Sequence, residues 1–129
     1  MKRSVLEKMT VEELESLAAI GDVDLSGCGG DSAAMVEALV DDSNRTMTVT
    51  VAGTDFKIRV SDMRDERVAD IQHSGTDSFA DVREMMECIL GAKQEKKLAD
   101  MSTDNGKLDV SLYSCIASEI CKKVQEKNS

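Results

Sequence analysis

The pattern of apolar positions in the first third of the chain is helical. Apolar side chains recur there every three or four residues, and Thr10 with Glu13 matches a capping box, in which each side chain accepts a hydrogen bond from the other's backbone N–H. Gly21 is placed to end this helix. Residues 23–25 then alternate between apolar and acidic side chains, as in an extended segment. We therefore expect a helix, a short extended link and a second helix over residues 5–42.

The period of the pattern changes to two after the polar stretch at residues 41–45, and we place a domain boundary between residues 43 and 44. Beyond it, two segments joined by a glycine-containing turn alternate apolar residues with threonines or charged residues. The apolar positions are Met47, Val49, Val51, Phe56, Ile58 and Val60. This pattern predicts a β-hairpin with one apolar face. Because a lone hairpin is marginally stable in water, that face must pack on helices.

Helical spacing returns after the hairpin and continues towards the end of the chain. We expect further helices to begin at Ser61, at Asp77 or Ser78, after Gly91 and near Val110. The last of these helices should bury four side chains on one face: Leu112, Ile116, Ile120 and Val124.

Together these patterns predict an α+β fold that is mainly helical. We divide it into a helix–extended–helix module over residues 1–43 and a second domain over residues 44–129, in which the hairpin packs on three or four helices. A chain of 129 residues is long enough for two such small domains. Its aromatic residues are only Phe56, Phe79 and Tyr113, so the cores must consist of aliphatic side chains and methionines.

The net charge of −9 restricts the partners that the chain can bind. An acidic protein is repelled by phosphate backbones and by anionic membranes, so we expect neither as a partner. The densest basic cluster, KQEKK at residues 93–97, is interrupted by Glu95 and holds no aromatic side chain for base stacking. We interpret it as a solvated helix face. Acidic residues interrupt any signal-peptide core and no apolar run has the length of a membrane span, which favours a cytoplasmic protein.

Candidate groups for metal binding or catalysis are scattered along the chain. The four cysteines lack C-x-x-C spacing and are remote in sequence from His73, so we expect reduced, mostly buried thiols and no metal. The segment from Asp100 imitates a calcium loop, but Asn105 stands where that loop needs glycine and Ser111 where it needs a bidentate glutamate. Neither His73 nor the pair 114–115 has a catalytic partner nearby in the sequence.

The glycine-rich segment VDLSGCGGDS, residues 23–32, has the composition of a loop that binds a nucleotide or S-adenosylmethionine. However, Gly27, Gly29 and Gly30 do not have the spacing G-x-G-x-x-G. Such a loop also follows the first strand of a parallel sheet, and this sequence predicts one hairpin and no series of alternating strands and helices. We therefore expect no cofactor and no enzymatic activity.

Residues 9–39, MTVEELESLAAIGDVDLSGCGGDSAAMVEAL, resemble the helix–extended–helix modules of the SAP and Rho-terminator N-terminal type. Leu14, Leu17 and Gly27 are among the matching positions. The resemblance implies that the glycines make the turn into the second helix. It also implies an alternative function as a nucleic-acid-binding adaptor, because such modules commonly bind nucleic acid through lysines and arginines around that helix.

The region that is basic in those modules reads CGGDSAA here. Residues 1–43 hold three basic and ten acidic residues, a net charge of −7. The electrostatic attraction that drives binding to a phosphate backbone would therefore have the wrong sign. We expect the fold of the module to be kept and its nucleic-acid binding to be absent.

Residues 47–124 resemble the tail assembly chaperones of long-tailed bacteriophages. In that family a strand pair with the pattern G-x-x-F/Y-x-I precedes a helix, and an LLG-containing segment precedes an acidic turn and a last helix. The matching residues are Gly53, Phe56, Ile58, Leu90, Gly91, Gln94, Leu98 and Leu108. The resemblance implies a non-enzymatic protein of the infected host cytoplasm that binds tail tube or tape-measure proteins before assembly.

The helix predicted over residues 78–90 carries more apolar side chains than one buried stripe requires. We expect Met86 to lie in the core and four other side chains to form a surface for a protein partner or for self-association: Phe79, Val82, Met85 and Cys88. Flexible methionine side chains suit a surface that must fit a variable or partly folded partner. The alternative is that all the methionines fill a core that is poor in aromatic residues.

Overall fold

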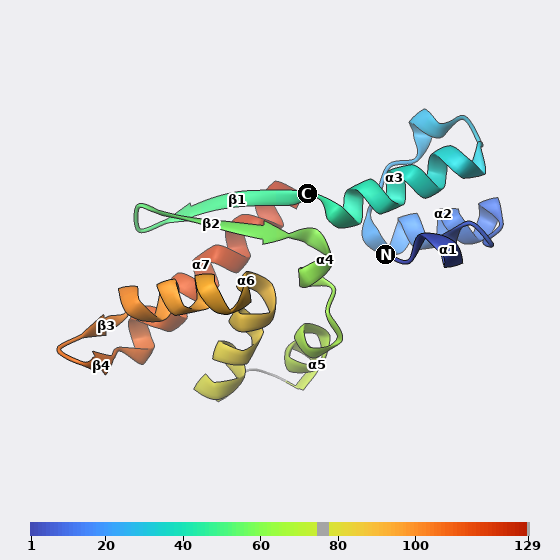
Figure 1. Ribbon diagram of the computed structural model, residues 1–129. Coiled ribbons are helices and arrows are strands. Elements are labelled where there is room, and N and C mark those ends of the chain that lie inside the picture. Colours follow the sequence, from blue (N-terminus) through green and yellow to red (C-terminus); the bar gives the residue numbers. More distant parts are fainter. Residues whose placement is uncertain (75–77, 129) are drawn as a thin grey trace. The chain divides into compact units, whose positions relative to one another are not determined.

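The computed structural model describes residues 1–74 and 78–128 (Figure 1). The chain divides into two compact units, unit 1 (Met1–Arg45) and unit 2 (Thr46–Ser129), whereas the sequence analysis places the boundary after Ser43. The fold is α+β and mainly helical, as predicted. The sequence also predicts that the helix from Ser61 ends near Gly75; this end and the candidate helix start at Asp77 lie outside the described residues.

Unit 1 is helical. Its elements are α1 (Arg3–Leu6), α2 (Val11–Gly21), the 3₁₀ helix η1 (Ser26–Cys28) and α3 (Ser32–Asn44). The predicted capping box begins α2, because the Thr10 hydroxyl accepts from the Glu13 N–H at 3.1 Å and the Glu13 carboxylate accepts from the Thr10 N–H at 2.8 Å. Asp31 caps α3 with a single side-chain hydrogen bond, by accepting from the Ala33 N–H at 3.1 Å. Side chains such as Leu14 and Leu39 are fully buried between these helices.

The link between α2 and α3 contains Asp22, residues 23–25 and then η1, a 3₁₀ turn that the sequence pattern does not predict. Asp22 adopts a left-handed conformation after the last residue of α2, and residues 23–25 pair with no strand in the described part of the chain. The Asp24 carboxylate accepts from the Ser26 N–H at 2.9 Å, which turns the chain into η1. Gly29 and Gly30 have positive φ angles of 59° and 80° and make the turn into α3, as predicted.

Unit 2 begins with the predicted hairpin of β1 (Thr46–Val51) and β2 (Thr54–Arg59), which are antiparallel. Ala52 and Gly53 both have positive φ angles, 53° and 73°, as a two-residue type I′ turn requires. The further elements of unit 2 are α4 (Val60–Met63), α5 (Glu66–Ser74), α6 (Phe79–Met101), β3 (Thr103–Asp104), β4 (Lys107–Leu108) and α7 (Val110–Asn128).

The apolar face of the hairpin packs on α6 and α7 (Figure 1), which confirms the prediction. All six predicted side chains of this face are buried: Met47, Val49, Val51, Phe56, Ile58 and Val60. Val60 is buried although it begins α4 instead of extending β2. Phe56 and Ile58 are fully enclosed together with Leu98 of α6 and Ile120 of α7.

Side chains of α6 cover the outer edge of β2. Gln94 pairs with the backbone of Lys57 as a neighbouring strand would: its Oε1 accepts from the Lys57 N–H at 2.7 Å and its Nε2 donates to the Lys57 carbonyl at 2.6 Å. Next to it, the Lys97 ammonium donates to the Asp55 carbonyl at 2.7 Å. These contacts satisfy backbone groups that an edge strand would otherwise offer to another chain.

The outer edge of β1 is covered from α7. The Lys123 ammonium donates to the Thr50 carbonyl at 2.6 Å, and the Lys127 ammonium donates to the Thr48 carbonyl at 2.5 Å. Both edges of the two-stranded sheet are therefore held by long polar side chains, and the hairpin is tied to the helices through its backbone as well as through its apolar face.

Helix α6 bends at Gly91, which has φ 81° and ψ 161° and divides it into a first arm (79–90) and a second arm (92–101). Gly91 thus ends the first helical run as predicted. Ser78 caps the first arm by accepting from the Ala80 N–H at 3.1 Å.

The predicted helix from Ser61 is also divided, into α4 and α5. The Asp65 carboxylate accepts from the Arg67 N–H at 2.8 Å at the start of α5.

A buried carboxylate joins the two arms of α6 to α7. Glu95 on the second arm is only 6% exposed. One of its oxygens, Oε1, accepts from the Arg83 Nε of the first arm at 2.7 Å and from the Tyr113 hydroxyl of α7 at 2.9 Å. Phe79 packs edge-on against Tyr113, with ring centroids 5.1 Å apart. The desolvation of a carboxylate costs several kcal/mol, which these two hydrogen bonds offset, so a change of the bend that broke them would leave a buried charge uncompensated.

The predicted buried face of α7 is corrected at one position. Ile116, Ile120 and Val124 are buried as predicted, but Leu112 is 44% exposed. Tyr113 is fully buried in its place, and its hydroxyl donates to Glu95. The segment before α7 forms the β3–β4 hairpin, which the apolar pattern does not predict. Asn105 and Gly106 make its turn with φ angles of 54° and 75°, so the Asn-Gly pair was the available signal.

Replacing Gly91 with alanine should destabilise unit 2 by about 1–3 kcal/mol, because its combination of φ and ψ is accessible essentially to glycine alone. No atom lies within 4 Å of the position that the new methyl group would occupy, so the cost is one of backbone conformation. Denaturant unfolding followed by circular dichroism measures it. The control is Gly27→Ala, where φ is not positive and space is equally free, and no loss of stability is expected there.

Tyr113→Phe should reveal the buried network through its pH dependence. Burial and the hydrogen bond to Glu95 raise the pKa of Tyr113 above its ordinary value. The folded state therefore favours the neutral phenol, so the neutral Tyr113 side chain increases the free energy of unfolding. This increase is complete below about pH 10 and is lost as the pH rises further. The variant should be less stable than the wild type by about 0.5–1.5 kcal/mol near neutral pH. This difference in unfolding free energy should shrink above about pH 10, and a constant difference would contradict the assignment.

Candidate functional site

An open groove with a volume of ≈ 390 Å³ runs between the first arm of α6 and α7. Its lining residues are Val82, Met85, Ser114, Ala117, Ser118 and Cys121. The four residues from α7 are small and recur at the spacing of one helix face. Because their side chains are short, they leave depth between the two helices that larger residues would fill.

Val82 and Met85 form the apolar wall of the groove. Both are half-buried and pack against the main core of unit 2, so each has one side on the core and one side towards solvent. The adjacent Met86 is fully buried, as the sequence analysis predicts. The two neighbouring methionines therefore lie in different environments, and Met85 keeps the conformational freedom that lets a thioether side chain fit different partners.

Phe79 and Cys88, the other two residues of the predicted partner surface, do not line the groove. Phe79 is half-buried and packs edge-on against Tyr113, so it belongs to the network around Glu95. Cys88 is half-buried, and the charges that act on it include Arg67 of α5. The structure thus brings together two of the four predicted residues.

The lining of the groove contains no acidic or basic side chain. Its titratable group is the Cys121 thiol, whose pKa is raised by burial, and the thiol is therefore protonated at neutral pH. A protonated thiol is a weak nucleophile and a poor metal ligand. The groove offers apolar surface together with the hydroxyl groups of Ser114 and Ser118, which suits the packing of another apolar segment more than it suits acid–base chemistry.

The α7 wall of the groove was not predicted as part of the surface. Ser114 was considered only with Cys115 as a candidate nucleophile, and Cys115 is exposed outside the groove. Thiols were expected to be mostly buried, but Cys28, Cys88 and Cys121 are only half-buried. The spacing of small residues along α7 was present in the sequence, yet its meaning depends on knowing that α6 packs beside it.

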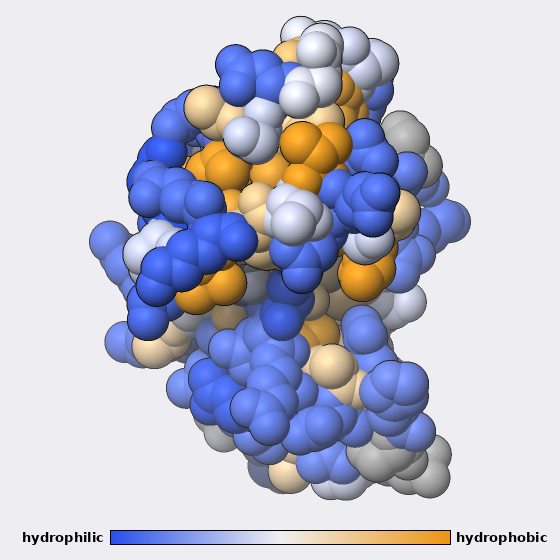
Figure 2. Space-filling view, turned by 90° about the vertical axis from the view of Figure 1, so that its right-hand side faces the viewer, coloured by the Kyte–Doolittle hydropathy of each residue, from blue (hydrophilic) through white to orange (hydrophobic). Residues whose placement is uncertain are grey.

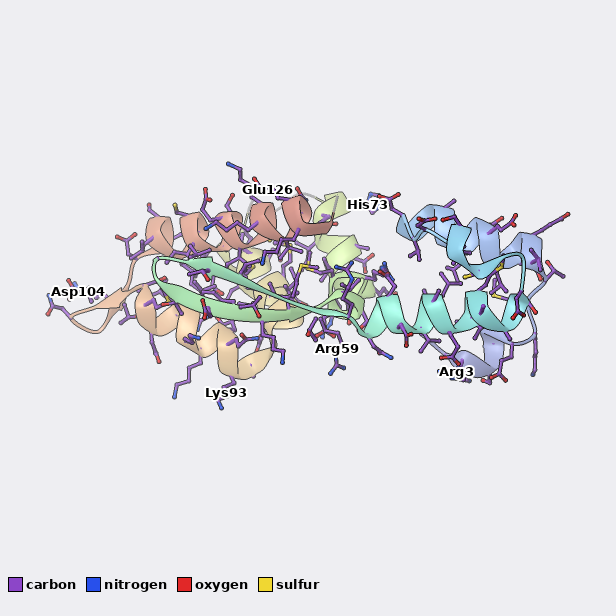
Figure 3. All side chains as sticks on the ribbon, turned by 90° about the horizontal axis from the view of Figure 1, so that it is seen from above. Arg3, Arg59, His73, Lys93, Asp104 and Glu126 are labelled. Atoms are coloured by element: carbon purple, nitrogen blue, oxygen red, sulfur yellow. The ribbon has the colours of Figure 1, made fainter. Side chains whose placement is uncertain are left out.

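The other candidates for chemistry lie apart from one another (Figure 3). His73 is exposed on α5, and Asp104 lies in the short β3–β4 hairpin. The segment that imitates a calcium loop is divided among the end of α6, this hairpin and the start of α7. Within residues 1–74 and 78–128, no three or more histidine, cysteine, aspartate or glutamate side chains come together in a way that could hold a metal ion.

A small hollow in unit 1 has no glycine in its lining. It has a volume of ≈ 190 Å³ and is lined by residues of α1, the following turn and α3, including Arg3 and Glu37, which form an exposed ion pair. Apolar surface is visible between charged side chains in the upper part of Figure 2. The large apolar residues of unit 1 that are most exposed are Met1, Val5 and Ile20.

Comparisons with protein families, with curated proteins and with solved structures found no match for this chain. None of the helices in the described ranges combines the length and the apolar character that a membrane span requires.

Proposed function

We propose that the chain is a non-enzymatic tail assembly chaperone of a long-tailed bacteriophage, which binds tail tube or tape-measure proteins in the host cytoplasm before assembly. The observation that carries the proposal is the open groove between α6 and α7, where Val82 and Met85 face small, uncharged side chains. A groove of this chemistry suits an apolar protein segment and offers nothing to hold a charged substrate.

The residues that carry the resemblance to tail assembly chaperones have defined structural roles, which supports the proposal. Gly53 makes the hairpin turn with a positive φ angle, and Phe56 and Ile58 are fully buried beneath it. Gly91 makes the bend of α6. Gln94 covers the edge of β2. The matching positions are therefore those on which the architecture of unit 2 depends.

We propose further that the occupant of the groove is the apolar face of a helix from the partner protein. The groove lies between two helices, and its α7 wall from Ser114 to Cys121 spans about two helical turns, or roughly 10 Å. Apolar helices commonly bind proteins in grooves of this kind, with anchor residues at helical spacing. The small α7 residues would let such a helix approach closely.

Nucleic-acid binding through unit 1, the alternative from its SAP-like pattern, has less support. The first turn of α3, where such modules are basic, begins with Asp31 and Ser32. Arg3 of α1 is paired with Glu37 of α3 and is not available as an unpaired cation. No observation in unit 1 favours a phosphate backbone as its ligand.

Met85→Asp should abolish binding of the tail tube or tape-measure protein encoded by the same genome, because it places a charge on the apolar wall of the groove. The purified partner would be titrated against the immobilised full chain. Leu112→Asp is the matched control, since Leu112 is an exposed apolar residue of α7 outside the groove. Ser118→Arg tests the opposite wall and should weaken the same binding. If the wild type binds neither protein, or if all variants bind equally, the proposal is wrong.

Met86→Ala should destabilise unit 2 by about 2–5 kcal/mol, the usual cost of truncating a fully buried methionine. Met85→Asp should reduce the unfolding free energy by less than Met86→Ala does, because Met85 is only half-buried and has one side towards solvent. Thermal and denaturant unfolding compare the two variants, and light scattering records whether either changes the oligomeric state. Equal destabilisation by both would place Met85 in the core and would remove the apolar wall of the proposed surface.

A further inference from the structure

A second hollow, with a volume of ≈ 630 Å³, lies where the end of the hairpin meets α4 and the bend of α6. Its lining residues are Thr46, Lys57, Arg59, Asp62, Ile89, Leu90, Lys93, Gln94 and Lys97. We call it the basic hollow, because four of these side chains are cationic and one is acidic. It shares no lining residue with the groove between α6 and α7.

The cations of the basic hollow come from segments far apart in the sequence. Lys57 and Arg59 extend from the solvent side of β2, opposite the buried Phe56 and Ile58. Lys93 and Lys97 extend from the second arm of α6. Figure 3 shows that Arg59 and Lys93 project towards the same side of unit 2. The cluster KQEKK is thus more than a solvated helix face, since the hairpin adds two cations beside it.

The charges of the basic hollow are largely uncompensated. Lys57, Arg59 and Lys93 are exposed, and their side chains form no ion pair with the described carboxylates. Glu95, which interrupts the basic cluster in the sequence, points into the core and is paired with Arg83. Asp62 is the one carboxylate in the lining, so the four cations of the hollow exceed its negative charge and raise the local concentration of anions.

The backbone around the basic hollow is held rigidly. The double hydrogen bond between Gln94 and the Lys57 backbone fixes the distance between β2 and the second arm of α6. The floor consists of Ile89 and Leu90, which are 1% and 6% exposed and belong to the core. The cationic side chains therefore extend from a preformed base, which reduces the ordering that binding would require.

Size and chemistry favour a short acidic peptide over nucleic acid as the ligand. The lining holds no aromatic side chain on which a base could stack. A nucleic acid would also extend beyond the hollow over a chain with a net charge of −9, which repels it. A segment with a few carboxylates can end within the hollow, where lysine and arginine side chains donate hydrogen bonds to its oxygens.

We propose that the basic hollow is a docking site for a short carboxylate-rich segment of a protein partner. The site is independent of the apolar groove, so the two surfaces can be tested separately. Binding should depend on Arg59 and Lys93 and should weaken as salt screens the exposed charges.

The test is a titration of the full chain with a fluorescent oligoglutamate peptide, followed by anisotropy, at an ionic strength of about 0.01 M, where the screening length is roughly 30 Å. Arg59→Glu/Lys93→Glu should weaken binding by about tenfold or more, since two favourable charge contacts become repulsive. Arg59→Gln/Lys93→Gln should give a smaller loss. The control Lys107→Glu/Lys122→Glu makes the same change in net charge at exposed positions outside the hollow and should keep the affinity within about twofold.

Three results would overturn the proposal. The first is no saturable binding of the peptide by the wild type. The second is equal weakening by the control variant, which would indicate an effect of net charge alone. The third is tighter binding of an oligothymidylate of the same net charge that depends on the same two residues, which would make the hollow a nucleic-acid site. Circular dichroism of each variant verifies that the fold is retained.

Discussion

Glu95 carries its charge in the interior of unit 2, where bulk water cannot stabilise it. Arg83 and Tyr113 both donate to the same oxygen, and they come from the first arm of α6 and from α7. The carboxylate therefore connects three segments at once, across the bend at Gly91, where φ and ψ are not helical. Val82, which lines the groove between α6 and α7, directly precedes Arg83 in the first arm.

Polar side chains of neighbouring helices also hold the hairpin. Its two strands have no neighbouring strand, and side chains of α6 and α7 take the place of one: Gln94 and Lys97 on β2, Lys123 and Lys127 on β1. Blocking the edges in this way directs interactions to side-chain surfaces instead of to the backbone. Unit 2 presents two such surfaces, an uncharged groove between helices and a basic hollow at the bend, and we propose that they bind different segments of a protein partner.

The local features of this fold were predictable from the sequence, and the contacts between distant segments were not. The capping box at Thr10 and the alternation along the hairpin depend on residues within a few positions of each other. The burial of Tyr113 in place of Leu112 depends on a carboxylate eighteen positions earlier. Met85 could be proposed as part of a surface from the pattern of its own helix. The α7 wall of the groove, and the fact that Arg59 and Lys93 line the same hollow, could be seen only in the folded chain.

Hydrogen–deuterium exchange of the full chain, with and without the tail tube or tape-measure protein of the same genome, tests the central claim most directly. If a partner helix occupies the groove, exchange should slow in the first arm of α6 (79–90) and in the first half of α7 (110–121). Exchange in unit 1 should stay unchanged. Protection confined to unit 1, or no protection of either helix under conditions where the proteins bind, would contradict the assignment of the groove as the partner-binding surface.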